Sequence, residues 1–508
     1  MVQERIRPRY VGLLNFISRI FALFVGFAFI TLVSRKLPVE VFGAWQYFSS
    51  VLTYFVIPAS VINFWATREA GREKAVGRTT LQLSFLTSLV SLSFFLVLVN
   101  LNLFMRTEIS NLVIYVFALW IVAYFVTTSA EAINYGLNPT LNVISSIVFE
   151  AVKLFFGVLL VIVFKLSLLG AILSIVLAFF FEFTFFVVMN PKMLSGNFDR
   201  TLIRKWIGNA WLPLITTLPG FISSLDVIFL GYILGSSSVI PIAYFKAALT
   251  FGSIVGYAGA ISFAIYPKIL KEGIDNSKSY IEDIVSLTNM FGIPMMFGAI
   301  ILSEPLLCIL REEYSVARNA LILLSVSSLL GANRSIFTSV LLGSEKADEK
   351  VSSFSKDLVN SLLFKLPMLD SINSLLYVVT LALATIVLSG LKAEYEFFAT
   401  ALAFSNLLWN LVFTFYYFSK VKSLIKLNLP KNSFIKYTIS SLVMSVVLVL
   451  IYPKSAVSEK LFLVLYGVLP VILIGAIVYF LFLLLIDKNT RVLVRKIVLL
   501  LTSLTNSK

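Results

Sequence analysis

Long apolar runs dominate the hydrophobic pattern along this chain, and each run is long enough to cross a lipid bilayer as a helix. About 20 predominantly apolar residues span the hydrocarbon core, and the sequence contains fourteen such runs. They cover residues 10–34, 43–66, 79–104, 110–131, 140–163, 167–190, 206–233, 238–265, 281–310, 318–342, 371–390, 395–418, 433–452 and 461–486. The pattern therefore predicts an all-α polytopic membrane protein. Pro294 and Pro305 predict kinks in the ninth run.

The composition agrees with this class and argues against several kinds of enzyme. Hydrophobic residues make up 59% of the chain and charged residues 13%, whereas soluble domains carry about 25% charged residues. The sequence has no histidine, and its single cysteine, Cys308, lies in an apolar run. These absences argue against a metalloenzyme or a triad hydrolase. No loop is long enough for a soluble catalytic domain, so we expect a transporter that needs no cofactor and no metal.

The lysines and arginines lie mainly on one side of the predicted membrane. Loops on the side of the N-terminus carry 27 of them and the opposite loops carry 9. Because positive loops stay in the cytoplasm, this split predicts a multi-pass cell-membrane protein with both termini cytoplasmic. The net charge of +15 is therefore mostly a topology signal, and no nucleic-acid partner is expected.

Two further basic segments invite a functional reading. The tail 488–508 mixes Lys and Arg with Leu, Val and Ile at roughly helical spacing, and we expect it to lie amphipathically at the cytoplasmic interface. The stretch GREKAVGRT (71–79) is similar to a phosphate-binding loop of nucleotide-binding proteins. Its spacing is one residue too long, Arg78 replaces the lysine, and it lies between membrane runs, so it does not predict ATP binding.

An internal repeat divides the chain. The junction of the first two runs reads LVSRKLPVEVFGAWQYFSSVL (32–52), and the junction of the seventh and eighth reads FLGYILGSSSVIPIAYFKAALTF (229–251). Both join two apolar helices through a short turn that an aromatic residue follows. The repeat predicts two equivalent six-helix lobes, residues 1–191 and 192–420, followed by two extra helices in 421–487 and the tail 488–508.

These junctions resemble those of a known family, the polysaccharide (O-antigen type) flippases of the multidrug/oligosaccharidyl-lipid/polysaccharide exporter superfamily. The first copy of the pattern is carried by Leu37, Pro38, Phe42, Gly43 and Trp45. The second copy is carried by Asp226, Leu230, Gly231, Leu234, Gly235, Val239 and Tyr244, with Ile240 and Pro241 in place of the expected glycine.

The resemblance implies two lobes that face each other across a central cavity and open it alternately to either side. It also implies a substrate, a glycan linked to polyprenyl phosphate or pyrophosphate. The expected partners are this lipid-linked oligosaccharide, membrane lipids, and glycosyltransferases or a polymerase of the same pathway. We expect a monomer.

Ionisable residues inside membrane runs are costly and are functional candidates by default. The set comprises Arg19, Glu150, Lys153, Glu182, Asp226, Lys246 and Arg334. We interpret Arg19, Lys153, Lys246 and Arg334 as substrate-binding residues, and Asp226, Glu150 and Glu182 as coupling or charge-tuning residues. Four cations against three anions favour an anionic substrate.

Each of these residues also has a structural interpretation. Glu150 and Lys153 lie three residues apart, so they can neutralise each other on one helix face. Asp226 and Lys246 lie about ten residues on either side of a turn near residue 236, so they can pair between antiparallel helices or face a polar cavity.

The two arginines and Glu182 leave similar alternatives open. Arg19 and Arg334 lie on polar helix stripes, and a guanidinium fork fits phosphate oxygens. Phosphate or glycan contact is the favoured interpretation, and pairing with glutamates across the lobe is the alternative for each arginine. Glu182 is either a site of proton or cation coupling or a gate or structural pair.

The predicted function is therefore a flippase that moves a lipid-linked oligosaccharide from the cytoplasmic to the outer leaflet by alternating access. The alternative is a proton- or sodium-coupled exporter of small organic cations, which needs acidic residues to dominate its cavity. A membrane glycosyltransferase needs a large extramembrane loop with catalytic carboxylates, and the sequence has no such loop.

Overall fold

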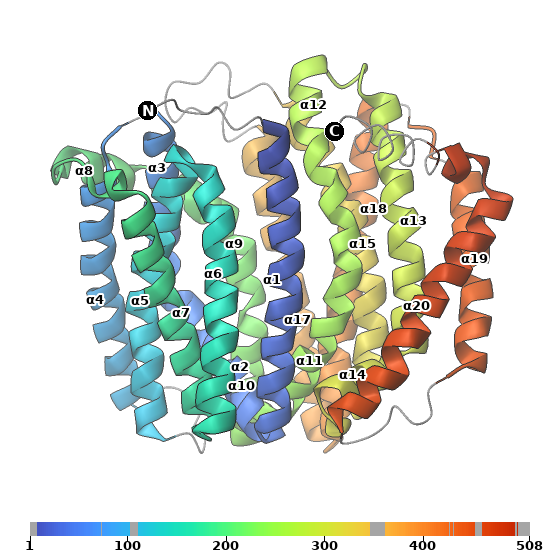
Figure 1. Ribbon diagram of the computed structural model, residues 1–508, viewed down its shortest axis with the longest axis horizontal. Helices are drawn as coiled ribbons and strands as arrows, with labels where there is room; N and C mark the ends of the chain where they lie inside the picture. The colour runs from blue at the N-terminus through green and yellow to red at the C-terminus, as the bar shows by residue number, and fades with distance from the viewer. Residues whose placement is uncertain are drawn as a thin grey trace, which may run out of the picture. The chain divides into compact units, whose positions relative to one another are not determined.

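The computed structural model confirms the predicted all-α fold. It describes residues 8–72, 74–101, 110–345, 361–425, 427–429, 431–452, 460–492 and 495, without the side chains of 8–20, 23, 263, 264 and 267. Among these residues there are helices and no strands, and each predicted run coincides with a helix or with consecutive helices (Figure 1). Eleven described helices are long and apolar enough to cross a membrane, or twelve if one bent pair counts as a span. Trp211–Ser262 is counted once there, although it holds the seventh and eighth predicted runs.

The chain divides into two compact units, Met1–Ala243 and Tyr244–Lys508. The lobe boundary predicted between residues 191 and 192 stays a prediction. The helices of the first unit are α1 (Pro8–Lys36), α2 (Val39–Phe55), α3 (Ile57–Gly71), α4 (Gly77–Asn100), α5 (Asn111–Leu137), α6 (Pro139–Gly157), the π-helical η1 (Val158–Val163), α7 (Ser167–Met189), the 3₁₀ turn η2 (Pro191–Leu194), α8 (Arg200–Gly208), α9 (Trp211–Ser223), α10 (Leu225–Leu234) and the 3₁₀ turn η3 (Gly235–Ser238).

Helix α11 (Val239–Gly252) crosses this division and leads into the second unit. The remaining elements are the 3₁₀ helix η4 (Ser253–Ala264), α12 (Ile265–Glu272), α13 (Lys278–Ile301), α14 (Ser303–Leu310), the 3₁₀ turn η5 (Glu312–Ala317), α15 (Arg318–Ser344), α17 (Leu362–Gly390), α18 (Tyr395–Leu424), α19 (Lys431–Leu450) and α20 (Leu461–Ile486). The last two are the extra helices that the repeat predicted.

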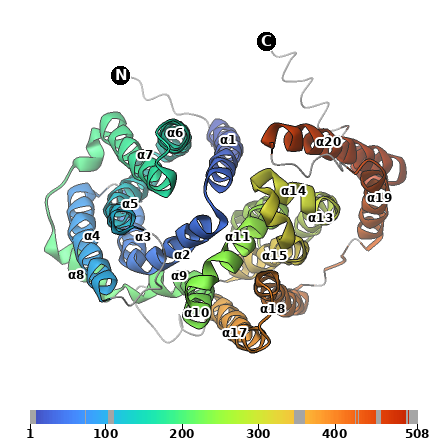
Figure 2. The ribbon, with the colours of Figure 1, turned by 90° about the horizontal axis from the view of Figure 1, so that it is seen from below.

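Helix α5 is the centre of the first unit, where it packs against α3, α4, α6 and α7 (Figure 2). Polar side chains join these helices inside the apolar core. Asn63 of α3 donates to the Thr128 hydroxyl of α5 at 3.1 Å and accepts from the Ser129 hydroxyl at 2.8 Å. Hydrogen bonds of this kind hold membrane helices together where lipid supplies no hydrophobic driving force.

The two similar junctions of the sequence meet inside the first unit. Leu37 and Leu230, one from each copy, are fully buried. Gly43 of α2 lies against the Val239 backbone, so closely that a Cβ atom at Gly43 would lie 1.8 Å from the Val239 carbonyl oxygen. Residue 43 must therefore be glycine for α2 to pack at this point.

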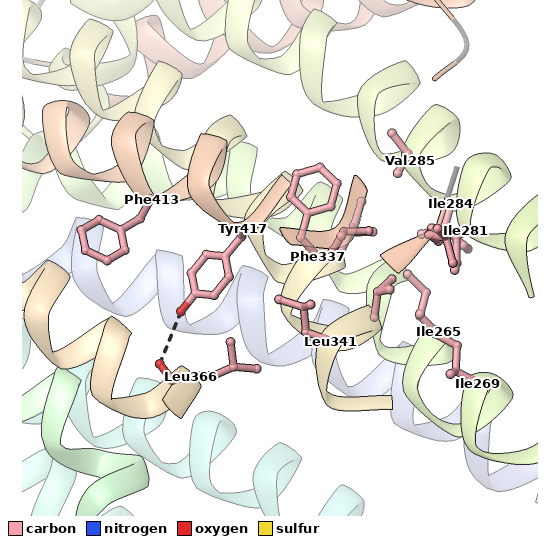
Figure 3. Packing of buried hydrophobic residues seen from close by; sticks show 14 residues of the cluster. Ile265, Ile269, Ile281, Ile284, Val285, Phe337, Leu341, Leu366, Phe413 and Tyr417 are labelled. Carbon is pink, nitrogen blue, oxygen red and sulfur yellow. Dashed lines mark hydrogen bonds between the residues drawn. The ribbon is translucent and has the colours of Figure 1, made fainter. Parts of the chain in front are cut away.

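Helix α15 is the centre of the second unit, in contact with α18, η4 and α13. Figure 3 shows part of the core around it, with Phe337 and Leu341 of α15 near Phe413 and Tyr417 of α18. The Tyr417 hydroxyl donates to the Leu366 carbonyl oxygen of α17 at 3.3 Å. This bond joins α17 to α18 next to the packing of α15 against α18.

Two helix breaks and one helix start differ from the sequence prediction. The second run is bent by 56° between α2 and α3, where Pro58 lies in the first turn of α3 and has no N–H for the helix. The ninth run breaks at Leu302, ahead of Pro305, whereas α13 continues through Pro294. The helix of the eleventh run, α17, begins at Leu362 instead of residue 371. The run was started too late because Lys365 and Asp370 lower the hydropathy of the first turns.

A buried carboxylate, that of Asp487, holds the first residues after α20 in place. Asp487 is 1% exposed; it pairs with Lys436 Nζ at 2.9 Å and accepts from the Thr490 amide and hydroxyl at 2.9 and 2.7 Å. Burial raises the pKa of Asp487, but the bonds from Thr490 and Lys436 outweigh burial and hold the pKa below its usual value. Most of the predicted amphipathic tail, residues 493–494 and 496–508, lies outside the described residues.

Candidate functional site

Arg334 lies in the middle of a polar group on α15, α17 and α18 in the second unit. With the Asn373 amide turned so that its oxygen faces Arg334, Arg334 Nη1 donates to that oxygen at 2.8 Å. The Asn373 nitrogen then donates to the Trp409 carbonyl oxygen at 3.3 Å. A guanidinium has five N–H donors, so donors other than this one can reach an anion bound beside it.

Asp370 of α17 is the acidic neighbour of Arg334. Its carboxylate lies 3.0 Å from the Tyr417 hydroxyl, whose single proton it shares with the Leu366 carbonyl oxygen, and it interacts electrostatically with Arg334. The sequence prediction missed Asp370 because the eleventh run was started one residue after it. Arg334 therefore has an acidic partner from another helix of its unit, and this partner is an aspartate instead of the glutamates considered from the sequence.

The polar face predicted for the stretch around Arg334 extends along much of α15. Asn333 and Asn289 of α13 exchange two amide hydrogen bonds at 2.8 and 3.2 Å. The hydroxyls of Ser335 and Ser262 lie 3.1 Å apart, and Ser327 donates to Asn406 of α18 at 2.6 Å. The Arg334 group therefore belongs to a hydrogen-bonded band between the helices of this unit.

Glu150 and Lys153 form the predicted pair in the first unit. Lys153 Nζ lies 2.7 Å from both carboxylate oxygens of Glu150. It also lies 5.3 and 5.1 Å from the ring centroids of Phe29 and Phe149, which is within cation–π range. Gly26 of α1 leaves room for the carboxylate, since a Cβ there would lie 3.3 Å from Glu150 Oε2.

Glu182 of α7 is 2% exposed and has a second carboxyl beside it. Its side chain is hydrogen-bonded to Ser145 of α6 and to Glu131 of α5. Glu131 and Glu182 thus form a buried pair of carboxyl groups on neighbouring helices. Sequence reasoning missed Glu131 because the fourth run was ended there, whereas α5 continues to Leu137.

Asp226 and Lys246 fall in different compact units. Asp226, in the first turn of α10, is 6% exposed, accepts from the Val227 amide at 2.6 Å and acts electrostatically on Tyr54 of α2. Lys246 Nζ lies 5.9 Å from the Phe245 ring. The turn predicted between them is η3, at Gly235–Ser238, and their pairing stays a prediction. Arg19 lies on α1, and its side chain lies outside the described ones.

Four of the seven predicted site residues thus fall in two groups, one in each unit, and Arg19, Asp226 and Lys246 belong to neither. The first group contains Glu131, Ser145, Glu150, Lys153 and Glu182, and Glu150 acts electrostatically on Glu182. The second group contains Arg334, Asp370, Asn373 and Tyr417. When Glu131 and Asp370 are added to the predicted set, it holds five acidic residues and four basic ones. The charge count alone therefore no longer favours an anionic substrate.

An apolar groove lies between helices of the second unit. Its volume is about 300 Å³, and its lining comes from η4, α13, α14, α19 and α20. Met295 and Gly298 of α13, Leu448 of α19 and Ile472 and Phe480 of α20 are among the lining residues. The two extra helices after the second predicted lobe thus form one wall of a site for an apolar group.

Comparisons with solved structures agree on the fold. A structure described as the lipid II flippase MurJ, in an inward closed conformation, is 16% identical, with 94% of this chain and 99% of that chain covered at a TM-score of 0.66. A multidrug resistance MATE family transporter of the MOP superfamily in an outward-facing conformation is 12% identical, with 84% and 98% covered at a TM-score of 0.56. An inward-facing structure of such a transporter is 11% identical, with 79% and 95% covered at a TM-score of 0.57.

No family model and no curated protein matches the sequence. The structural likeness therefore shows that this chain has the fold of MOP-superfamily transporters, as the resemblance of its two junctions implied. Identities this low leave substrate and coupling to arguments from the chain's own residues.

Proposed function

We propose that this protein is a membrane transporter that flips a lipid-linked oligosaccharide from the cytoplasmic to the outer leaflet. Its fold is shared with a lipid II flippase and with multidrug transporters, so the fold does not choose between the two activities. The choice rests on the apolar groove of the second unit.

The groove favours a lipid substrate because its lining is almost entirely apolar and because the extra helices α19 and α20 build one wall. The aromatic rings of the lining can contact a cation, but no described lining residue is acidic, so the groove supplies no counter-charge for an organic cation. An isoprenoid chain already lies in lipid, so what it gains in this groove is close packing against apolar side chains. The groove therefore suits the lipid portion of a substrate whose headgroup is bound elsewhere.

Arg334 is the residue best suited to that headgroup in the second unit. It is a permanent cation that Asn373 holds by a hydrogen bond at 2.8 Å, while Asp370 and Tyr417 on neighbouring helices fix its surroundings. A fixed guanidinium forms strong, directional bonds to phosphate oxygens. Lys246, Lys153 and Arg19 are proposed as weaker contributors, and Asp226, Glu150 and Glu182 as tuning or coupling residues.

The buried Glu131–Glu182 pair favours a second candidate, a proton-coupled exporter of small organic cations. The pair is buried in the first unit beside Ser145 and near Glu150. A carboxyl pair that gains and loses a proton as access alternates would couple transport to a proton gradient. Such coupling would serve a flippase as well, so the substrate is what separates the candidates.

Filling the groove at Gly298 tests the lipid interpretation. Gly298 lines the groove, and a Cβ added there would meet no atom within 4 Å, so the larger side chain of Gly298→Phe is expected to occupy space in the groove. We expect the variant to fold and to lose most flipping of a fluorescent polyprenyl-pyrophosphate oligosaccharide in proteoliposomes.

Gly220→Phe in α9 is the matched control, because a Cβ at Gly220 also meets no atom within 4 Å and Gly220 does not line the groove. We expect this control to keep its transport. Loss of efflux of a cationic dye by Gly298→Phe, with lipid flipping unaffected, would instead support the cation exporter.

A further inference from the structure

A polar cavity lies in the first unit where α3, α5 and α7 end, on the side that the loop charges predict to be cytoplasmic. Its volume is about 640 Å³, within the range of sites that bind small molecules. The loop after α3 and the segment after α7 supply much of its lining. None of the lining residues belongs to the Glu131–Glu182 group described above.

Close backbone contacts fix the walls of this cavity. A Cβ at Gly77 would lie 1.7 Å from the Met193 carbonyl oxygen, and a Cβ at Gly136 would lie 2.6 Å from the Gly71 nitrogen. The Arg78 amide donates to the Ser195 carbonyl oxygen at 3.2 Å. Backbone contacts therefore hold the segments around the cavity in place, and the shape of the cavity is set by the backbone.

The charged side chains that line the cavity are Lys74 and Lys192. Lys74 is held in place by the carboxylate of Glu69, which is 0% exposed. The same carboxylate lies 3.1 Å from Lys205 Nζ and 3.8 Å from Arg72 Nη1. Among the described residues, one buried carboxylate thus faces several cations, which leaves an excess of positive charge beside the cavity, as an anion site requires.

The remaining lining residues are partly polar and partly apolar, which suits an amphiphilic ligand. Asn138 and Asn190 offer side-chain amides, whereas Ile133, Leu137 and Met189 are apolar. Because α5 and α7 end here, at Leu137 and Met189, the cavity lies at the level where membrane spans give way to lipid headgroups. A ligand with a phosphate and an apolar part satisfies both kinds of lining.

We propose that this cavity binds the phosphate group of an anionic phospholipid from the surrounding leaflet. The proposal gives a role to the GREKAVGRT stretch, whose residues Gly71, Lys74 and Gly77 line the cavity. The stretch lies between α3 and α4. It forms one wall of the proposed site, in which Lys74 of this loop and Lys192 of the segment after α7 contact the phosphate.

Purified full-length protein, titrated with dioctanoyl phosphatidylglycerol and separately with inorganic phosphate, tests the site through the shift of its melting temperature. We expect the phospholipid to stabilise the wild type and Lys192→Ala to weaken its apparent affinity about fivefold. We expect Lys192→Glu to abolish the stabilisation by the phospholipid. Lys422→Ala, which removes an exposed lysine at the end of α18, is the matched control and should bind like the wild type.

Variants of Lys192 are preferred to variants of Lys74, because Lys74 also neutralises Glu69. Equal stabilisation by inorganic phosphate, lost in the same variants, would overturn the phospholipid as the source and identify a free phosphate. An unchanged phospholipid affinity in Lys192→Glu would overturn the site itself.

Discussion

Replacement of Arg334 by alanine is expected to abolish transport while the protein still inserts and folds. Arg334 is proposed to contact the phosphate of the substrate, and a charge-assisted hydrogen bond contributes about 1.5–3 kcal/mol. Two such bonds to one phosphate correspond to a loss of roughly a hundredfold or more in transport rate. The measurement is flipping of a fluorescent polyprenyl-pyrophosphate oligosaccharide in proteoliposomes at matched protein content.

Three companion variants make the Arg334 result interpretable. Arg334→Lys keeps the charge without the fork and should retain partial transport. Arg318→Ala removes an exposed arginine at the start of the same helix and should transport normally. If Arg334→Ala folds poorly because Asp370 loses its cation, Arg334→Ala with Asp370→Asn removes that charge and should fold without transporting. Normal transport by this double variant would remove Arg334 from the site.

Replacement of Gly43 by alanine is expected to destabilise the first unit strongly. The added Cβ would lie 1.8 Å from the Val239 oxygen and 2.6 Å from the Val239 carbonyl carbon, and backbone atoms cannot move aside as a flexible side chain can. Overpacking of this kind costs about 3 kcal/mol or more. The melting temperature of the purified protein should fall by roughly 5 °C or more.

Gly220→Ala is the control for Gly43, because it adds the same atom inside a helix of the same unit where no neighbour lies within 4 Å. Alanine is also the better helix former by about 0.5–1 kcal/mol. The control should therefore melt at or above the wild-type temperature. A Gly43→Ala variant as stable as this control would show that the contact between the two junctions does not hold α2 in place.

Local sequence patterns predicted much of this fold. Apolar runs of bilayer length located the membrane helices, because a span must be apolar along most of its length. The spacing of three between Glu150 and Lys153 was enough to predict their ion pair, since both lie on one helix. The small and polar residues around Arg334 likewise predicted a hydrophilic face on α15, now seen in bonds such as that between Asn333 and Asn289.

Other features depend on contacts that no local pattern encodes. Asp370 and Glu131 lie at the ends of apolar runs. Because charged residues lower the hydropathy, the eleventh run was started too late and the fourth was ended too early. Their partners, Tyr417 and Glu182, come from other helices and become neighbours only through packing. The approach of Gly43 to Val239 joins residues far apart in the sequence, and the repeat pointed to both junctions without predicting that they touch.

The location of lipid-linked glycan precursors after deletion of the gene tests the proposed function most directly. The deleted strain should lose or reduce its surface glycan and accumulate the lipid-linked precursor on the cytoplasmic face of the membrane. Complementation by the wild type should restore the glycan, and complementation by Gly298→Phe should not. Unchanged surface glycans and precursors, together with increased sensitivity to cationic dyes, would contradict the flippase and identify an exporter of organic cations.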